Sequence, residues 1–284
     1  MPYRRPDLGN IEKEYMNFTA KFSKSQSAEE QYHLILEHEK LSKNFETMMS
    51  IAYIRNSMNT TDPYYEKEMA FFDANSPVFE EYQQNFYKAV AGTQYRAELE
   101  KLTGKLFFTN IELSLKSFSP AVIDLMKKEN ALVTEYEKLL ASAKIDIAGT
   151  TVNLSQITKF STSPDRKLRK EAWEKSGAFF VKNSRRFDEI YDELIQNRTE
   201  QAHKLGYENY VQLGYDRLGR NCYGPQEIEE YRKQIVQNLV PMIVKLKKQQ
   251  AKRLGLSDIK LYDDACLFSD GNPTPKGNTQ ELVK

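Results

Sequence analysis

Apolar residues recur at intervals of three or four along most of the chain, and this spacing places them on one face of an α-helix. The spacing is clearest between positions 228 and 246, at Ile228, Tyr231, Ile235, Leu239, Met242 and Leu246. Pro225 should start this helix and Gly255 should end it. Pro241 lies inside the stripe and should kink the helix, because proline removes one backbone hydrogen bond and clashes one turn back.

The same periodicity predicts two helices near the start of the chain, from about 7 to 22 and from 27 to about 58. Ser27 is a suitable N-cap for the second, and Glu30 follows three residues later, as in a capping box. Residues 59–63 contain turn formers and a proline, so they should break the helix.

Three Ser-Pro pairs are predicted to mark further helix starts, because serine caps a helix and proline is tolerated in its first turn. The pairs lie at 76–77, 119–120 and 163–164. The last pair belongs to the segment 161–165, which should open a long helix. The apolar stripe predicted on that helix consists of Phe187, Ile190, Tyr191 and Leu194.

The period changes from helical to alternating between about 144 and 154. Ile145, Ile147, Val152 and Leu154 flank Gly149-Thr150, a pattern that predicts a small β-hairpin with a tight turn. The fold class predicted for the whole chain is therefore all-α, with one β-hairpin.

Composition narrows the classes of partner. The 284 residues suffice for one large domain or two small ones, and Lys+Arg 41 against Asp+Glu 40 leaves a net charge of +1. This balance argues against a general nucleic-acid binder, since such proteins are usually strongly basic. We expect no membrane partner either, because no stretch of about 18 apolar residues occurs.

The cellular setting predicted from the sequence is cytoplasmic. No apolar segment of the secretory type follows the two arginines at positions 4 and 5. Cys222 and Cys266 form neither a disulfide framework nor a Cys-x-x-Cys pair.

Metal-binding patterns are incomplete. A peptidase helix of the type His-Glu-x-x-His presents two imidazoles one turn apart, and His38-Glu39 is followed by Ser42 where the second histidine is needed. His33 and His38 are separated by about 140° around a helix, so they cannot clamp one metal ion. We interpret this segment as a solvated polar face.

Other candidate sites compete with structural interpretations. Two Glu-x-x-His pairs match the spacing of di-iron carboxylate bundles, although glutamate is frequent in this chain; they are Glu30 with His33 and Glu200 with His203. The cysteines have no nearby histidine in sequence and are interpreted as small packing residues. No phosphate-binding or dinucleotide-binding glycine motif occurs.

The segment 205–220 contains two Leu-Gly-Tyr repeats, at 205–207 and 213–215. Glycine can end a helix and let the chain turn, so the pattern predicts a helix–turn–helix corner in which tyrosines pack. Arg217 and Arg220 could bind carboxylates, including a peptide's C-terminus, but are interpreted as structural ion pairs.

Several short strings, in order along the chain, resemble the oligoendopeptidase F family, zinc metallopeptidases of the thimet oligopeptidase and Pz-peptidase type. The strings lie at 71–73, 76–77, 116–120, 132–144, 153–156, 163–166, 187–194, 205–220, 262–264 and 271–277. The resemblance implies an all-α hydrolase with an internal channel for unfolded oligopeptides. It also implies one zinc ion, held by two histidines of His-Glu-x-x-His and a later glutamate, with the motif's own glutamate activating water.

The family's zinc motif would lie beyond Lys284, so no catalytic, cofactor-binding or metal-binding residue can be carried onto this chain, and we expect it to bind no zinc and to be inactive alone. The division predicted from the resemblance is an N-terminal helical lobe at 1–160 and the start of a helical catalytic domain at 161–284. The chain resembles one that is cut in mid-domain, with the remainder of the catalytic domain as its partner. The alternative is a non-catalytic helical protein that binds peptides or serves as a scaffold.

Overall fold

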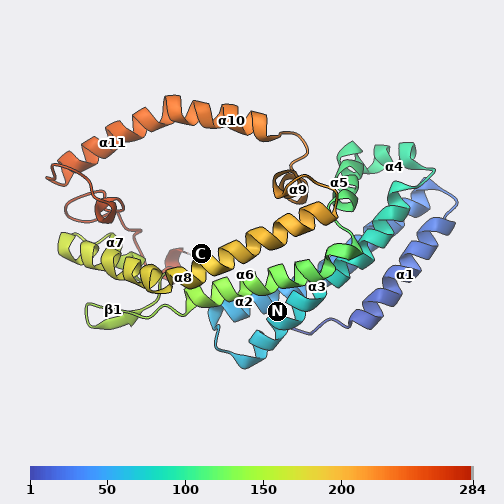
Figure 1. Cartoon of the computed structure of the whole chain (residues 1–284), viewed down its shortest axis with the longest axis horizontal. Coiled ribbons are helices and arrows are strands. Elements are labelled where there is room, and N and C mark those ends of the chain that lie inside the picture. Colours follow the sequence, from blue (N-terminus) through green and yellow to red (C-terminus); the bar gives the residue numbers. More distant parts are fainter. Residues whose placement is uncertain (283–284) are drawn as a thin grey trace. The chain divides into compact units, whose positions relative to one another are not determined.

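The computed structural model describes residues 1–282, and helices make up most of them (Figure 1). Within this part of the chain the strands form one two-stranded sheet, so the predicted all-α class with a single hairpin is confirmed. Two compact units are present. The first combines Met1–Tyr136 with Ile190–Gly224, and the second combines Glu137–Glu189 with the described residues from Pro225 onward.

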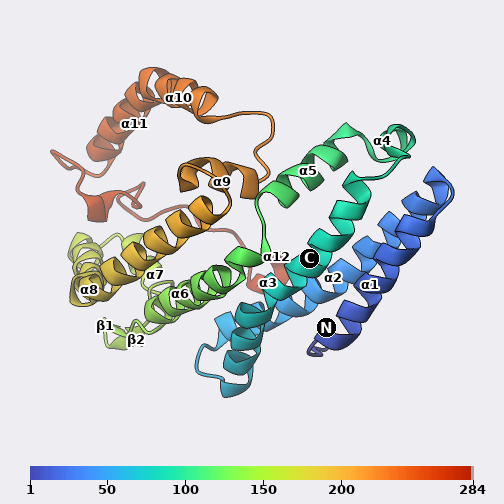
Figure 2. The ribbon, with the colours of Figure 1, turned by 45° about the vertical axis from the view of Figure 1, so that its right-hand side comes forward.

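The first unit is built on three long helices that pack against one another, α1 (Leu8–Lys24), α2 (Ala28–Met58) and α3 (Pro63–Ala91). Figure 2 shows them side by side. The elements that follow are α4 (Arg96–Thr103), α5 (Lys105–Lys116), a 3-10 turn (Pro120–Val122) and α6 (Ile123–Ala141). The unit also contains the second half of α8 (Arg166–Lys204) and all of α9 (Tyr210–Arg217).

The predicted starts of the first two helices are confirmed. Asp7 caps α1 by accepting a hydrogen bond from the backbone N–H of Asn10 at 3.1 Å. Ser27 caps α2 by accepting from the N–H of Glu30 at 3.2 Å, and the Glu30 carboxylate accepts from the N–H of Gln26 at 2.8 Å. These contacts satisfy donors that the first turn of a helix leaves free.

The prediction that Ser76-Pro77 starts a helix is wrong. Helix α3 begins at Pro63, capped by Asp62, and continues through Pro77, which is buried. The hydroxyl of Ser76 accepts a hydrogen bond from Asn130 at 3.2 Å instead of capping a backbone N–H. Packing of α3 against α1 and α2 therefore outweighs the backbone hydrogen bond that Pro77 removes.

The other two Ser-Pro pairs lie close to helix starts. Ser119 caps the 3-10 turn that leads into α6, as predicted, by accepting from the N–H of Ala121 at 3.2 Å. Helix α8 begins at Arg166, and its cap is Asp165, which accepts from the N–H of Lys167 at 2.8 Å. Ser163 therefore precedes the helix without capping it, because the carboxylate two residues later takes that role.

Aromatic rings fill the core between α1, α2 and α3. Phe45 and Phe79 stack with their ring centres 3.9 Å apart. Tyr15 is almost fully buried, and its hydroxyl lies 2.8 Å from the hydroxyl of Ser42, so its polar end is satisfied. Large rings of this kind supply much of the apolar area that a helical core buries.

His38 belongs to this core, so its interpretation as part of a solvated polar face is wrong. Its side chain stacks on Phe86 at 4.2 Å and meets Tyr15 edge-on at 5.0 Å. Within the described residues its Nε2 atom has no hydrogen-bond partner. Burial disfavours the charged imidazolium and lowers the pKa of His38 to about 4.

The hairpin of the second unit is confirmed in position and register. Strands β1 (Ile145–Ile147) and β2 (Thr150–Val152) pair antiparallel, with Ile145 opposite Val152. The turn residues Ala148 and Gly149 both have positive φ, 49° and 75°, as a tight primed turn requires. The buried faces of the strands pack on Ile157 and on Ala172 of α8.

The remaining elements of the second unit are helical. They are α7 (Thr158–Ser161), the first half of α8, α10 (Pro225–Gln234), a π-helical segment (Ile235–Leu239), α11 (Val240–Arg253), a 3-10 turn (Leu261–Asp263) and α12 (Thr279–Leu282). None of the helices described between residues 1 and 282 combines the length and apolar character needed to cross a membrane.

The distortion expected from Pro241 takes the form of the π-helical segment that ends one residue before α11 begins. A wider turn there accommodates a residue that has no N–H and that crowds the preceding turn. Gly255 ends α11 with φ 66°, as predicted, and the N–H of Leu256 closes the end by binding the carbonyl of Ala251 at 2.9 Å.

Not all predicted apolar stripes are buried. On α8, Ile190 is buried but Tyr191 is exposed. Along α10, the π-helical segment and α11, the exposed fractions of four apolar residues lie between 43% and 62%; they are Tyr231, Leu239, Met242 and Leu246. The helical periodicity is correct in both regions, but it does not show what covers the apolar face.

We predict that His38 makes the free energy of unfolding depend on pH between about 6.5 and 4. The unfolded chain binds a proton at His38 below about 6.5, whereas the folded chain does so only below about 4, so stability falls as the pH falls through this window. Replacing His38 with Phe should flatten the dependence, as measured by urea unfolding at pH 7 and 4.5. The control is His33→Gln, since His33 is exposed on the same helix. Parallel pH profiles for the native chain and His38→Phe would contradict this assignment.

Candidate functional site

The segment 205–220 forms the predicted helix–turn–helix corner. Helix α8 ends at Lys204, and Gly206 follows with φ 82°, where a side chain would be strained. The N–H of Tyr207 reaches back to the carbonyl of Ala202 at 2.9 Å and closes the end of α8. Asn209 then caps α9 by accepting from the N–H of Val211 at 2.9 Å.

A buried carboxylate organises this corner. The side chain of Asp216 is 3% exposed and accepts hydrogen bonds from the Tyr207 hydroxyl at 2.6 Å and from Gln212 at 2.8 Å. It also pairs with the ammonium group of Lys116, at the end of α5, at 3.1 Å. Lys116 lies over the ring of Tyr207 as well, 4.9 Å from its centre.

These contacts decide the charge states of Asp216 and Tyr207. Burial alone would raise the pKa of Asp216, but the hydrogen bonds from Tyr207, Gln212 and Lys116 outweigh it and hold that pKa below its usual value. Burial and the bond to Asp216 raise the pKa of Tyr207. At neutral pH Asp216 is therefore a fixed anion and Tyr207 a fixed donor, which suits positioning of α9 rather than proton transfer. The sequence contains the Tyr207–Asp216 spacing but no sign that Lys116 joins them.

The two arginines of the segment are held differently. A guanidinium nitrogen of Arg217 lies 3.9 Å from the carboxylate of Glu129, and another donates to the carbonyl of Ser117 at 3.5 Å. Arg220 lies over the ring of Tyr215, 4.8 Å from its centre. The predicted structural ion pair is thus present for Arg217, although it is long, whereas Arg220 makes cation–π contacts.

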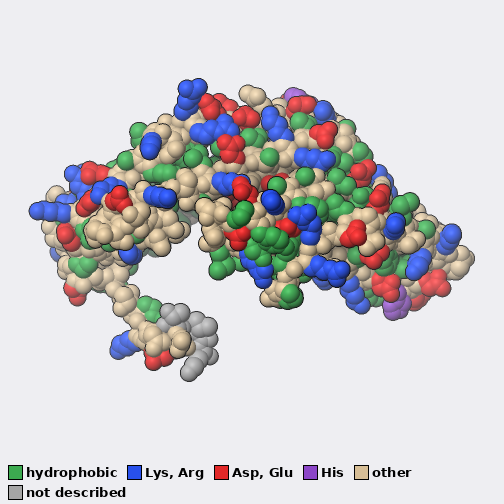
Figure 3. Space-filling model, turned by 90° about the horizontal axis from the view of Figure 1, so that it is seen from below, with side chains coloured by type: hydrophobic (Ala, Val, Ile, Leu, Met, Phe, Trp, Pro, Cys, Tyr) green, Lys and Arg blue, Asp and Glu red, His purple; other side chains and the backbone are tan. Residues whose placement is uncertain are grey.

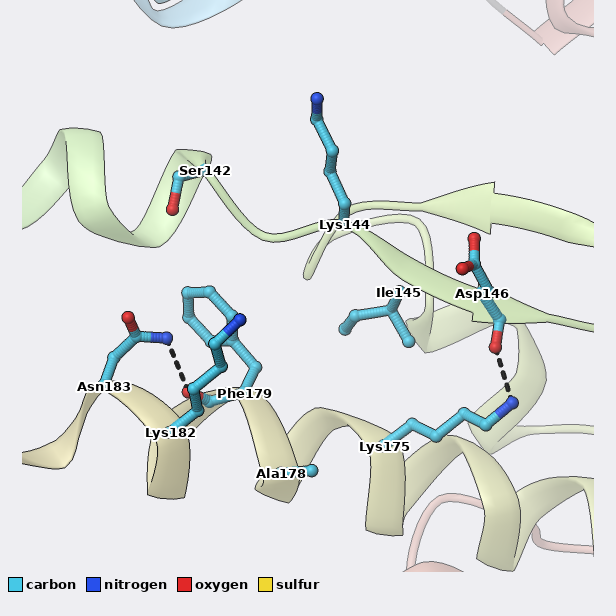
Figure 4. Close-up of a pocket in the computed structure, with 9 residues that line it drawn as sticks. All are labelled: Ser142, Lys144, Ile145, Asp146, Lys175, Ala178, Phe179, Lys182 and Asn183. Carbon is cyan, nitrogen blue, oxygen red and sulfur yellow. Dashed lines mark hydrogen bonds between the residues drawn. The ribbon is translucent and has the colours of Figure 1, made fainter.

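A cavity of about 600 Å³ lies beside the hairpin of the second unit (Figure 4). Lys175 on α8 donates to the backbone carbonyl of Asp146 on β1 at 2.5 Å, and Asn183 donates to the carbonyl of Phe179 at 2.8 Å. Phe179 and Lys182 lie one turn apart on α8, and both line the cavity. The lining therefore combines ammonium groups, an amide and an aromatic ring, and the ammonium of Lys175 is also paired with Glu171 at 2.6 Å.

The charge on the molecular surface is mixed. On the face drawn in Figure 3, lysine and arginine side chains alternate with aspartate and glutamate over the whole area, with apolar patches among them. This distribution agrees with the near-zero net charge of the sequence.

Two arginines and one aspartate join the start of α8 to the 3-10 turn at Leu261–Asp263. Asp263 is fully buried and pairs with Arg166 and Arg169, each at 2.9 Å. Arg169 also donates to the carbonyls of Ser163 and Pro164 at 2.7 and 3.0 Å. Burial opposes ionisation of Asp263, but the two arginines outweigh it and lower its pKa to about 2.

The histidines and cysteines do not assemble into a metal centre. Across the described residues 1–282, no group of three or more His, Cys, Asp or Glu side chains is placed to hold a metal ion. His203 is exposed and contacts the carbonyl of Glu208 at 3.1 Å, and Glu200 pairs with Lys204 at 3.2 Å. The spacing of the two Glu-x-x-His pairs therefore does not produce a di-iron site here, and these residues do not fit a zinc ion.

The cysteines are separate as well. Cys222 is exposed and Cys266 is buried, and neither forms a disulfide. The thiol of Cys266 donates to the carbonyl of Phe268 at 3.4 Å, as a packed residue would.

Comparison with known proteins decides the family. The model for the peptidase M3 N-terminal domain matches residues 1–118, and the model for peptidase family M3 matches residues 160–266. This chain belongs to peptidase family M3. The predicted resemblance to oligoendopeptidase F is confirmed by solved structures of that type.

Three solved structures of peptidases align over almost the whole chain. "PZ peptidase A with inhibitor 2" is 39% identical with a TM-score of 0.96, covering 100% of this chain and 50% of that one. A putative oligoendopeptidase F is 37% identical with a TM-score of 0.96, again covering 100% and 50%. A putative oligoendopeptidase F from Bacillus anthracis str. Ames is 38% identical with a TM-score of 0.94, covering 99% and 52%. The chain thus spans about half the length of these relatives, and a search of curated proteins finds no match.

The predicted division at 160/161 concerns functional lobes and stays a prediction. The two compact units of the M3 chain divide it differently, because α6 and α8 each contribute residues to both units.

We predict that Asp216→Asn lowers the free energy of unfolding by about 2 kcal/mol, since it removes a charged acceptor from a buried network. Tyr207→Phe should cost less, because Asp216 keeps its bonds to Lys116 and Gln212. Urea unfolding of both variants at pH 7 gives the comparison. Asp124→Asn is the control, since its side chain is 99% exposed. A cost for Asp216→Asn no larger than that of the control would contradict the assignment.

We predict that Asp263→Asn increases hydrogen exchange in residues 256–268, because the turn loses its anchor to Arg166 and Arg169. The folded-state pKa is below that of the unfolded chain, so the contribution of Asp263 is present above about pH 4 and is lost as the pH falls toward 2. The variant should therefore differ from the native chain at pH 7 and converge with it near pH 2. The exchange of β1 and β2 serves as an internal reference, and unchanged exchange in 256–268 at pH 7 would contradict the prediction.

Proposed function

We propose that this chain is the amino-terminal part of a zinc-dependent oligoendopeptidase that hydrolyses short unfolded peptides in an internal channel. The observation that carries the proposal is the match to PZ peptidase A over 100% of this chain, at a TM-score of 0.96, while only 50% of that chain is covered. The M3 family models at both ends of the chain support the same activity.

Within this proposal, zinc is held outside residues 1–284. Support comes from the donor set of the described residues: His38 is enclosed by aromatic rings, and the exposed histidines have no second and third ligand beside them. We therefore assign no step of peptide hydrolysis to a residue of this chain.

The residues of this chain serve peptide binding in the proposed enzyme. The cavity beside the hairpin presents Lys175 and Lys182 next to Phe179, a combination that binds backbone carbonyls, carboxylates and apolar side chains without demanding one sequence. Loose side-chain preference with a limit on peptide length is the expected specificity. The cytoplasmic setting stays a prediction.

The exposed apolar face that runs along α10, the π-helical segment and α11 suggests that another part of the protein packs on it. Tyr231, Leu239, Met242 and Leu246 share this face, and each exposes more than two fifths of its surface. Exposed apolar faces of this extent usually mark interaction sites. We propose that the remainder of the catalytic domain covers it.

The test is zinc content together with cleavage of an internally quenched peptide by residues 1–284. We expect less than about one tenth of an equivalent of zinc after dialysis, because no described group offers three ligands. We also expect no turnover that a chelator abolishes. Stoichiometric zinc with metal-dependent turnover would overturn the assignment of the zinc site to another part of the protein.

A hydrophobic dye separates the proposal from a self-sufficient binding or scaffold protein. The proposal predicts dye binding by the isolated chain, which falls in Leu246→Glu because that residue lies on the apolar face of α11. Met16→Glu on α1 is the control, since Met16 is 67% exposed but belongs to the first unit. A monomer that unfolds cooperatively and binds no dye would favour the scaffold alternative.

A further inference from the structure

A second, smaller cavity lies within the first unit, between α3, α5 and the corner at α9. Its volume is about 400 Å³, at the lower end of the range typical of small-molecule sites. The side chain of Asn221 donates to that of Asn110 at 2.7 Å, so two amides meet at its wall. The charged side chains that line the cavity are Glu80, Asp216 and Arg217.

Glu80 differs from the other carboxylates that are withdrawn from water. Asp216, in the same wall, is satisfied by three donors. Among the described residues Glu80 has no hydrogen bond and no ion pair, although it is only partly exposed. Burial raises its pKa, and the nearby charge of Arg217 does not fully offset this. A carboxylate in this position is short of a donor or a positive charge.

Arg217 is the complementary group. Among residues 1–282 its guanidinium makes two long contacts, to Ser117 at 3.5 Å and to Glu129 at 3.9 Å. A guanidinium carries five N–H donors in a planar fork that fits a carboxylate with two parallel hydrogen bonds. It therefore has donors left for an acceptor in the cavity.

We propose that this cavity binds a small zwitterion, a free α-amino acid or a dipeptide, with its ammonium group against Glu80 and its carboxylate against Arg217. A simple anion would be repelled by the carboxylate of Glu80, which has no ion-pair partner among the described residues. A simple cation would be repelled by Arg217, whose guanidinium faces Glu129 at the long distance of 3.9 Å. A ligand that carries both charges satisfies both groups and leaves the cavity neutral. The site goes beyond the proposed function, since it requires neither zinc nor peptide cleavage.

The first experiment measures binding to residues 1–284 by calorimetry, with L-alanine and L-alanyl-L-alanine as probes. Saturable binding of either one is expected, and the comparison shows whether the cavity takes an amino acid or a dipeptide. Acetylating the amino group or amidating the carboxylate of the better probe should weaken binding at least about tenfold, since each removes one charge-assisted contact. If neither probe saturates the protein up to about 20 mM, the proposal is overturned, because a dissociation constant above that range does not indicate a specific site. Equal binding of the acetylated or amidated form would overturn it as well.

The second experiment uses Glu80→Gln, with Glu81→Gln as a matched control on the same helix outside this cavity. Without ligand, Glu80→Gln should unfold at the same or a higher temperature than the native chain at pH 8, because it relieves a desolvated and unpaired charge. It should nevertheless lose at least about tenfold in affinity for the better probe, whereas Glu81→Gln should bind it normally. Normal binding by Glu80→Gln, or an equal loss in both variants, would overturn the assignment of Glu80.

Discussion

A carboxylate that is withdrawn from water needs donors, and the supply of donors to three such carboxylates joins parts of the chain that are far apart in sequence. Glu68 on α3 receives Arg5 at 2.7 and 2.9 Å together with the hydroxyl of Tyr3, which holds the start of the chain against that helix. Asp216 receives Lys116 and thereby joins α9 to α5. Asp263 receives Arg166 and Arg169 and thereby joins a late turn to the start of α8.

Glu80 differs from these three carboxylates in the direction of its pKa shift. Each of those three carboxylates has a pKa below its usual value because its donors outweigh burial, whereas the pKa of Glu80 is raised because burial outweighs the charge of Arg217. An unpaired carboxylate costs stability, and such a cost is commonly tolerated where a ligand later supplies the missing partner. The contrast between Glu80 and its paired neighbour Asp216 is the physical basis for placing a small-molecule site in that cavity.

Family membership bears on the reaction, whereas the geometry of the described residues bears on which surfaces and ligands this chain contributes. Membership in peptidase family M3 supports the proposed class of chemistry, hydrolysis of peptide bonds. The described residues offer a cavity beside the hairpin and an exposed apolar face on α10 and α11, but no set of three metal ligands. The proposal that another part of the protein supplies the zinc site and covers this face reconciles the two observations, and both halves of it are open to direct measurement.

The sequence by itself determined the elements whose signals are local. The N-cap at Ser27, the hairpin around Gly149 and the end of α11 at Gly255 all depend on a few consecutive residues and were predictable. The family resemblance could also be recognised from the sequence, because it rests on short runs of residues.

Tertiary structure decided the remainder. Pro77 stays inside α3 because helix packing outweighs one lost hydrogen bond, and His38 is buried because aromatic rings from α1 and α3 enclose it. The partners of Asp216 and the isolation of Glu80 likewise depend on which helices meet, since burial and charge pairing depend on distances in space that spacing along the chain does not specify.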